Sequence, residues 1–147
     1  MTLWGPRPSR LVGAVVKLSA QLLWSSMPFH PVVPILRSFD EGKAREFYLE
    51  WLGFKVDFAH RFQPSSPLYM QVSRGDCVIH LSEHHGDGSP GACIRIRVDD
   101  LEAFFTELQS RPYKNYKPGL QDQEWGTREM VVQDGASNRL VFYRHLK

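Results

Sequence analysis

The stretch that decides the fold is DQEWGTREMVVQDGASNRLVFY, residues Asp122 to Tyr143. Polar and apolar side chains alternate over residues 127–133 and again over residues 138–144. A period of two is typical of strands that bury one face. Asp134-Gly135 lies between the two runs and favours a tight turn. The stretch therefore predicts a β-hairpin.

An aromatic–glycine pair, Trp125-Gly126, immediately precedes this hairpin. Glycine lets the backbone approach a ligand closely, and an indole offers a flat face for stacking. A tryptophan at the start of a strand also commonly packs into a core or a subunit interface. The sequence leaves both interpretations open.

Two stretches of the chain resemble one protein family. One stretch is residues 125–142, which show the pattern W-G-x-R-E followed by D, N and F. The other stretch is residues Val33 to Phe54, with the sequence VPILRSFDEGKAREFYLEWLGF. Both are similar to bleomycin-resistance proteins of the glyoxalase, or vicinal-oxygen-chelate, superfamily. The resemblance extends over residues 32–144. It implies an α+β fold in which two βαβββ modules form a cupped mixed sheet with helices outside.

The order of predicted elements agrees with two such modules, at about residues 32–85 and 92–145. The first is predicted to contain a strand at 32–37, a helix at 40–52 and strands near 55–61, 68–73 and 78–82. The second is predicted to contain a strand at 92–98, a helix at 100–110 and strands near 113–116, 128–132 and 139–144. Asp40 and Asp100 are expected to cap the helices, and Gly53 to end the first one.

Strand alternation also predicts which side chains form the core. Ile94, Ile96 and Val98 make an unbroken apolar side of one strand, which should pack on the helices. Together with the apolar stripes of the helices, the same reasoning predicts a core of Val32, Leu36, Phe47, Trp51, Phe54, Ile94, Ile96, Val98, Leu101, Phe105, Leu140 and Phe142.

The opposite strand face is predicted to line a cavity. Four arginines point there, namely Arg37, Arg95, Arg97 and Arg139. Arg37 and Arg139 lie near strand ends, where arginine also reaches solvent or pairs with an acid such as Glu129. Arg95 lies in mid-strand, where a guanidinium needs a partner.

The resemblance adds Trp125, which matches the aromatic residue of the family's Trp-Gly element, and Asp57-Phe58, which match an Asp-Phe pair. An aromatic residue is expected where Arg95 stands, so this chain should favour an anionic or polar group on its ligand. The predicted ligand site is Trp125, Gly126, Asp57, Phe58, Phe62, Tyr69, Arg95 and Arg97.

The resemblance also bears on metal and function. Metal enzymes of the superfamily carry ligands where this chain has Val33, Cys93 and Val141. Valine cannot ligate a metal. The chain is therefore expected to bind no metal and no other cofactor.

The expected function is that of a homodimeric small-molecule-binding protein of the bleomycin-resistance type, such as an antibiotic-sequestering protein. Its cavity is expected at the dimer interface. The alternatives are a metal-dependent lyase or dioxygenase, with ligands such as His80 and His84, and a regulatory partner with a filled cavity.

Composition excludes other classes. The chain has 147 residues, of which 42% are hydrophobic and 23% charged, as is ordinary for one soluble domain. No apolar run reaches the length of a membrane span. All 16 acidic residues lie at or after Asp40, so the body has no basic stripe for nucleic acid. Cys77 and Cys93 lack zinc-finger spacing, which predicts reduced thiols in the cytoplasm.

Residues 1–26 differ from the rest because they contain no acidic residue. Leu11, Val15, Leu18 and Leu22 would share one helical face. This leader is expected to be an extension upstream of a working start at Met27, a disordered or loosely packed amphipathic helix, or a targeting segment. The domain is predicted to comprise residues 27–147.

Overall fold

The computed structural model describes Lys17 and residues 20–147. Its contacts divide the chain into two units, one up to Val32 and one from Val33 to Lys147. In the first unit, residues 20–25 are helical. Leu22 is exposed there, while Leu11, Val15 and Leu18 of the predicted helical face lie outside the described residues. No described helix is long and apolar enough to cross a membrane.

The second unit begins with one βαβββ module. Its elements are β1 (Ile35–Arg37), α2 (Glu41–Ala44) with its π-helical continuation η1 (Arg45–Trp51), β2 (Lys55–His60), β3 (Tyr69–Arg74) and β4 (Cys77–Ser82). The strands form a sheet in the order β1-β4-β3-β2. β1 runs parallel to β4, and the other neighbours are antiparallel.

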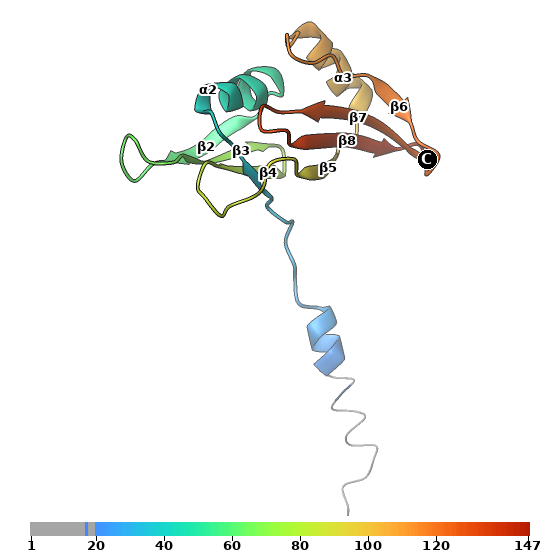
Figure 1. Ribbon diagram of the computed structural model, residues 1–147. Coiled ribbons are helices and arrows are strands. Elements are labelled where there is room, and N and C mark those ends of the chain that lie inside the picture. Colours follow the sequence, from blue (N-terminus) through green and yellow to red (C-terminus); the bar gives the residue numbers. More distant parts are fainter. Residues whose placement is uncertain (1–16, 18–19) are drawn as a thin grey trace, which may run out of the picture. The chain divides into compact units, whose positions relative to one another are not determined.

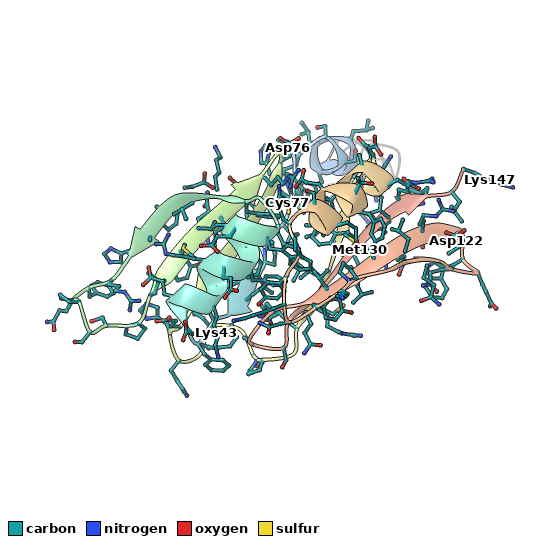
Figure 2. The ribbon with its side chains drawn as sticks, turned by 90° about the horizontal axis from the view of Figure 1, so that it is seen from above. Lys43, Asp76, Cys77, Asp122, Met130 and Lys147 are labelled. Atoms are coloured by element: carbon teal, nitrogen blue, oxygen red, sulfur yellow. The ribbon has the colours of Figure 1, made fainter. Side chains whose placement is uncertain are left out.

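A second module repeats this arrangement. Its elements are β5 (Cys93–Arg97), α3 (Leu101–Ser110), β6 (Leu120–Asp122), β7 (Thr127–Gln133) and β8 (Arg139–His145). The sheet order is β5-β8-β7-β6, again with one parallel pair. Figures 1 and 2 show both helices on the same side of the two sheets. The predicted pair of βαβββ modules is confirmed.

Both helices begin at the predicted caps. Asp40 accepts a hydrogen bond from the Lys43 amide at 2.9 Å, and Asp100 accepts one from the Ala103 amide at 3.0 Å. These carboxylates satisfy amides that have no partner within the helix. Gly53 ends the first helix at a φ of +74°, a conformation that favours glycine. The π-helical turn before it was not predicted.

The β7–β8 hairpin is also confirmed, and its turn fastens the two modules together. The Asp134 carboxylate accepts the amides of Ala136 and Asn138, both at 2.9 Å, and the Tyr48 hydroxyl of the first module at 2.6 Å. The Asn138 side chain donates to the backbone oxygen of Arg37 at 2.8 Å. The turn residues that predict the hairpin thus also connect it to η1 and β1.

The core lies between the helices and the sheets. Most of the predicted core residues are buried, but five of them are not. Val32 is 87% exposed because β1 begins only at Ile35. In α3, Phe104 is the buried aromatic residue, and Phe105 is half-buried. Ile94, Ile96 and Val98 are also only half-buried, because β5 is an edge strand.

The strand predicted near residues 113–116 is wrong. Tyr113 and Tyr116 instead close a tight turn through an isolated bridge. Tyr113 stacks on Trp51 of the first module with ring centroids 4.9 Å apart, so its ring packs between modules rather than on a strand face. The sixth strand is β6, which pairs with β7 through Leu120 and Met130. Met130 is fully buried and appears near the middle of Figure 2.

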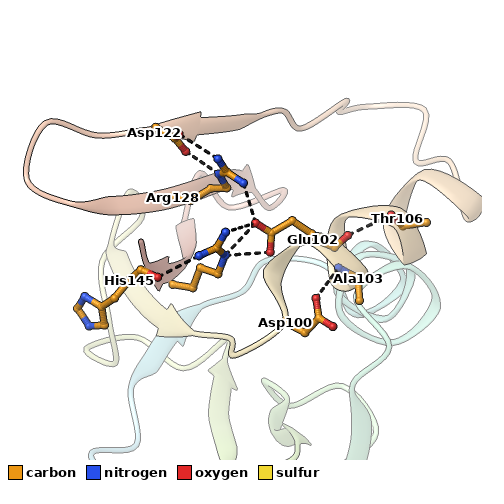
Figure 3. Close-up of polar contacts among 8 residues, drawn as sticks. Asp100, Glu102, Ala103, Thr106, Asp122, Arg128 and His145 are labelled. Carbon is orange, nitrogen blue, oxygen red and sulfur yellow. Dashed lines mark hydrogen bonds and ion pairs between the residues drawn. The ribbon is translucent and has the colours of Figure 1, made fainter. Parts of the chain in front are cut away.

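Two clusters of ion pairs hold α3 in place. Glu102 accepts hydrogen bonds from Arg144 at 2.6 Å and from Arg128 at 2.8 Å, and Arg128 also pairs with Asp122 at 2.6 Å (Figure 3). This cluster joins α3 to β6, β7 and β8. At the other end of α3, Glu107 accepts from Arg74 of β3 at 2.7 Å, which joins α3 to the first module.

Candidate functional site

The candidate site lies on the faces of the two sheets that point away from the helices, which we call the open faces. Paired residues on neighbouring strands point to the same side of a sheet. In the first sheet this register places Phe58, Gln71 and His80 side by side. In the second sheet it places Glu129, Tyr143 and Arg97 in one row.

A buried carboxylate organises the open face of the second sheet. The Glu129 side chain is only 7% exposed. Its Oε2 atom accepts hydrogen bonds from Arg95 Nη2 at 2.8 Å, Thr127 Oγ1 at 2.7 Å and Trp125 Nε1 at 3.2 Å. The bond from Arg95 is the main reason that the pKa of Glu129 falls to about 2, with smaller contributions from Thr127 and Trp125. Glu129 is therefore charged at neutral pH.

Trp125 and Arg95 are held by this carboxylate but remain accessible. The indole is 68% exposed although its N–H is bonded. The Arg95 side chain is 45% exposed, and its guanidinium carbon lies 4.5 Å from the centre of the Tyr143 ring. Gly126 has a φ of +91°, and apart from its two chain neighbours no described residue has an atom within 4 Å of where a side chain would begin. An aromatic ligand can therefore approach the indole from open space.

The open face of the first sheet carries a directed chain of hydrogen bonds. Tyr69 Oη lies 2.6 Å from His80 Nδ1, His80 Nε2 lies 2.9 Å from Gln71 Oε1, and Gln71 Nε2 donates to Asp57 at 3.0 Å. The Gln71 oxygen can only accept, so neutral His80 carries its proton on Nε2 and accepts from Tyr69 on Nδ1. Gln71 is also the main reason that the pKa of Asp57 is lowered.

Aromatic side chains border this hydrogen-bond chain. Phe58 lies nearly parallel to Tyr69, with ring centroids 6.5 Å apart. Phe58 is 44% exposed and Phe62 is 79% exposed. Around them is an open depression of about 560 Å³, lined by Phe58, His60, Phe62, Tyr69, His84, His85 and Asp87. This depression is wide enough for a small aromatic molecule.

The structure divides the predicted ligand residues between the two sheets. Asp57, Phe58, Phe62 and Tyr69 gather on or beside the first sheet, and Trp125, Gly126 and Arg95 on the second. Arg97 projects into solvent with its Nε atom 3.5 Å from Asp99 and joins neither cluster. Their roles in ligand binding stay predictions.

Arg37 does not line the cavity as predicted. It is 8% exposed, and its guanidinium donates to the backbone oxygens of Ser82 at 3.2 Å and Gly88 at 2.9 Å, and also to that of Asp87. Arg37 therefore holds the loop between β4 and β5, which links the two modules. This loop folds back over β1, with Gly88 against the backbone of residues 35–37. Strand alternation does not predict such a fold of the loop.

The two histidines suggested as metal ligands make other contacts in the structure. Both ring nitrogens of His80 are already hydrogen-bonded, and the His84 ring lies against Tyr69. Among the described residues, no group of three or more His, Cys, Asp and Glu is placed to hold a metal ion.

Three side chains outside the predicted ligand site connect its residues. Gln71 and His80 join Asp57 to Tyr69, and Glu129 joins Arg95 to Trp125. Glu129 has the same strand parity as the other cavity-facing residues of β7. Parity could have placed it on the open face, but not next to Arg95, because that contact depends on the register across β8.

A family model described as a glyoxalase superfamily protein matches residues 18–147. The chain belongs to the glyoxalase superfamily. No curated protein matches it.

Several solved structures are similar to this superfamily member. A bleomycin-binding protein complexed with bleomycin is 26% identical with a TM-score of 0.60, over 80% of this chain and 99% of that chain. A bleomycin resistance determinant encoded on the transposon Tn5 is 23% identical with a TM-score of 0.61, over 80% and 98%. TnmS3, an antibiotic-binding protein from Streptomyces sp. CB03234, is 19% identical with a TM-score of 0.59, over 81% and 98%. The last two show a shared fold.

Proposed function

We propose that this protein is a metal-free small-molecule-binding protein of the bleomycin-resistance type, which sequesters an aromatic, antibiotic-like ligand. The proposal is based on the exposure and the fixed orientation of the Trp125 side chain. Its indole is 68% exposed, yet its N–H is bonded to the buried carboxylate of Glu129. An aromatic surface whose orientation is fixed before binding loses little conformational entropy when a ligand stacks on it. The bleomycin-binding protein of known structure supports the ligand class.

The proposed binding cavity is completed by a second copy of the chain. The depression beside Phe58 and Phe62 is lined by residues of the first module, while Trp125 projects from the second. Ile35, Phe58 and Trp125 leave 42%, 44% and 68% of their surfaces exposed. A two-fold dimer would place the aromatics of one copy against the indole of the other and remove this apolar surface from water.

The residue chemistry also supports two further parts of the proposal, namely that binding needs no metal and that the protein is cytoplasmic. The valines at positions 33 and 141 offer no ligand atom, and the two nitrogens of His80 are engaged, so we propose that binding needs no metal. Cys77 and Cys93 are both free thiols. Free thiols persist in a reducing compartment, so we place the protein in the cytoplasm.

Calorimetric titration with metal-free bleomycin and with planar aromatic antibiotics tests the proposal. Trp125→Ala should weaken binding at least about tenfold, because buried tryptophans commonly contribute most to an interface. Trp24→Ala is a matched control, because that indole is also 68% exposed but lies in the other unit. Equal losses in both variants, or no binding of any compound, would contradict the proposal.

Sedimentation analysis and metal analysis test the remaining features. A dimer at micromolar concentration, stabilised further by ligand, is expected. A monomer in the presence of saturating ligand would show that the cavity is not shared. Stoichiometric metal in the purified protein, lost in His80→Ala, would favour a metal-dependent lyase or dioxygenase instead.

A further inference from the structure

The open face of the second sheet carries an excess of positive charge. Arg95, Arg97 and Arg139 all project from it, as the register with β8 shows. Among the residues of β5, β6, β7 and β8 on this face, Glu129 is the only carboxylate. Within these strands one carboxylate therefore shares the face with three guanidinium groups, and Asp99, just beyond the end of β5, lies near Arg97.

The negative charge of Glu129 is already used within the protein. Its side chain is 7% exposed, and Arg95, Thr127 and Trp125 all donate to its Oε2 atom. A cationic ligand could take this carboxylate as its counter-ion only by competing with Arg95. Such competition would leave a guanidinium beside a ligand of the same charge, which is unfavourable.

Arg95, in contrast, has N–H groups that make no hydrogen bond with a described residue. Only its Nη2 atom makes a hydrogen bond or ion pair with a described residue. The guanidinium is held above the Tyr143 ring at 4.5 Å and is 45% exposed. A planar guanidinium with a fixed orientation and free N–H groups is suited to a carboxylate, sulfonate or phosphate, which it can bind through two hydrogen bonds.

The neighbouring arginines reinforce this preference. Arg139 is exposed and has no ion-pair partner among the described residues. Arg97 is 62% exposed and lies 3.5 Å from Asp99, which is itself 92% exposed. Such an exposed pair is weak. Both guanidinium groups therefore add to the positive potential around Arg95.

The anion-binding donors lie beside the aromatic platform. Arg95 and Trp125 donate to the same oxygen atom of Glu129, so guanidinium and indole are neighbours. Building on the function proposed above, we infer that the ligand is a planar aromatic molecule with an anionic group attached directly to its ring system. The ring stacks on Trp125 and the anion binds Arg95, with Arg97 and Arg139 adding long-range attraction.

Three naphthalene probes that differ mainly in charge test this inference. They are 2-naphthalenesulfonate, the neutral 2-naphthalenesulfonamide and the cationic 2-naphthyltrimethylammonium. Binding is followed by NMR through the indole N–H resonance of Trp125. The sulfonate should bind about 10- to 100-fold more tightly than the sulfonamide, as expected for charge-assisted hydrogen bonds, and its advantage should shrink as salt is added. The ammonium should bind most weakly.

Matched arginine variants locate the anion. Arg95→Gln should remove most of the advantage of the sulfonate and leave sulfonamide binding within about threefold. Arg139→Gln should cause a smaller loss, because it acts at longer range. Arg45→Gln removes the same charge from the helical layer, where Arg45 pairs with Glu41, and should change nothing. Arg95→Lys retains a cation beside Glu129 without the planar fork, so it tests anion binding even if Arg95→Gln fails to fold.

The outcomes separate this inference from the function on which it rests. If the ammonium binds as tightly as the sulfonate, and both require Trp125, the protein is an aromatic-binding protein and the anionic ligand class is wrong. If no probe shifts the Trp125 resonance, or Trp125→Ala leaves all binding unchanged, both proposals fall. A sulfonate preference that survives in Arg95→Lys and Arg95→Gln alike would also overturn the assignment of Arg95.

Discussion

Arg95 and Glu129 form an ion pair across an intervening strand, with 2.8 Å between Nη2 and Oε2. Arg95 lies on the edge strand β5 and Glu129 on β7, and β8 runs between them. The pair therefore connects β5 to β7 across β8 and holds the exposed indole of Trp125 through the same carboxylate oxygen. The contact contributes both to the stability of the sheet edge and to the shape of the proposed site.

Glu129→Gln should destabilise the domain by about 1–3 kcal/mol, because it leaves Arg95 without its counter-ion and weakens two further hydrogen bonds. The measurement is the free energy of unfolding in urea. Glu50→Gln, at an exposed helical position, is the control and should be nearly neutral. In the same variant the Trp125 indole resonance should broaden or shift. Unchanged stability together with an unchanged indole resonance would show that the carboxylate does not hold the ring.

Acid should destabilise the domain. Glu102, Glu107 and Glu129 each have a pKa lowered to about 2, mainly by hydrogen bonds from Arg144, Arg74 and Arg95 respectively. An unfolded glutamate titrates near about pH 4.3. These groups therefore contribute stability that is fully present above about pH 5 and is lost as the pH falls toward about 2.

Urea midpoints measured between neutral pH and about pH 2.5 test this expectation. Glu107→Gln removes one of the three titrating groups, so its stability should depend less steeply on pH than that of the wild type. A wild-type midpoint that stays constant between about pH 5 and 3 would contradict the lowered pKa values.

Substitution by alanine should affect stability very differently at a buried and at an exposed phenylalanine. Phe142 is 2% exposed and packs against Phe104 with ring centroids 4.9 Å apart. Phe142→Ala should therefore destabilise the protein by about 3–5 kcal/mol. Phe62 is 79% exposed, so Phe62→Ala should change the stability by less than about 0.5 kcal/mol. Similar losses in the two variants would mean that the helix-facing side has been misassigned.

Tyr48→Phe should loosen the junction between the modules. The Tyr48 hydroxyl donates to Asp134 at 2.6 Å in a partly buried contact, and its removal should cost about 1–3 kcal/mol. Tyr116→Phe is the control, because Tyr116 is 36% exposed. Burial also raises the pKa of Tyr48 well above its usual value, with a further contribution from the charge of Asp134. Spectrophotometric titration should therefore show one tyrosine that does not ionise until the protein unfolds.

Removal of residues 1–26 should leave the domain folded. The unit from Val33 to Lys147 contains both βαβββ modules and the core cluster. The truncated protein should have the same Tm and the same oligomeric state as the full chain, measured by calorimetry and sedimentation. An insoluble protein, or a fall in Tm of more than about 4 °C, would show that the leader stabilises the domain by roughly 1 kcal/mol or more.

Local sequence determined the elements that depend on neighbouring residues. Asp40, Asp100 and Gly53 marked helix ends because capping involves amides within one turn. Asp134-Gly135 marked the hairpin, and strand alternation placed Arg95 on the cavity face, whereas Trp125 was assigned to the site through the resemblance to bleomycin-resistance proteins. Two predictions from local sequence were wrong. Residues 113–116, with tyrosines at both ends, were predicted to form a strand but form a turn, and Val32 lies before β1 rather than within it.

Only the tertiary structure decided how the site residues are joined. Strand alternation predicted that Arg37 and Arg95 both face the cavity. In the structure the guanidinium of Arg37 donates to the backbone oxygens of Ser82 and Gly88, whereas only Nη2 of Arg95 makes a hydrogen bond with a described residue. The Tyr69–His80–Gln71 chain and the shared oxygen of Glu129 likewise cross several strands. Such contacts depend on strand order and register, which are set by how the whole core packs and not by the residues adjacent in the chain.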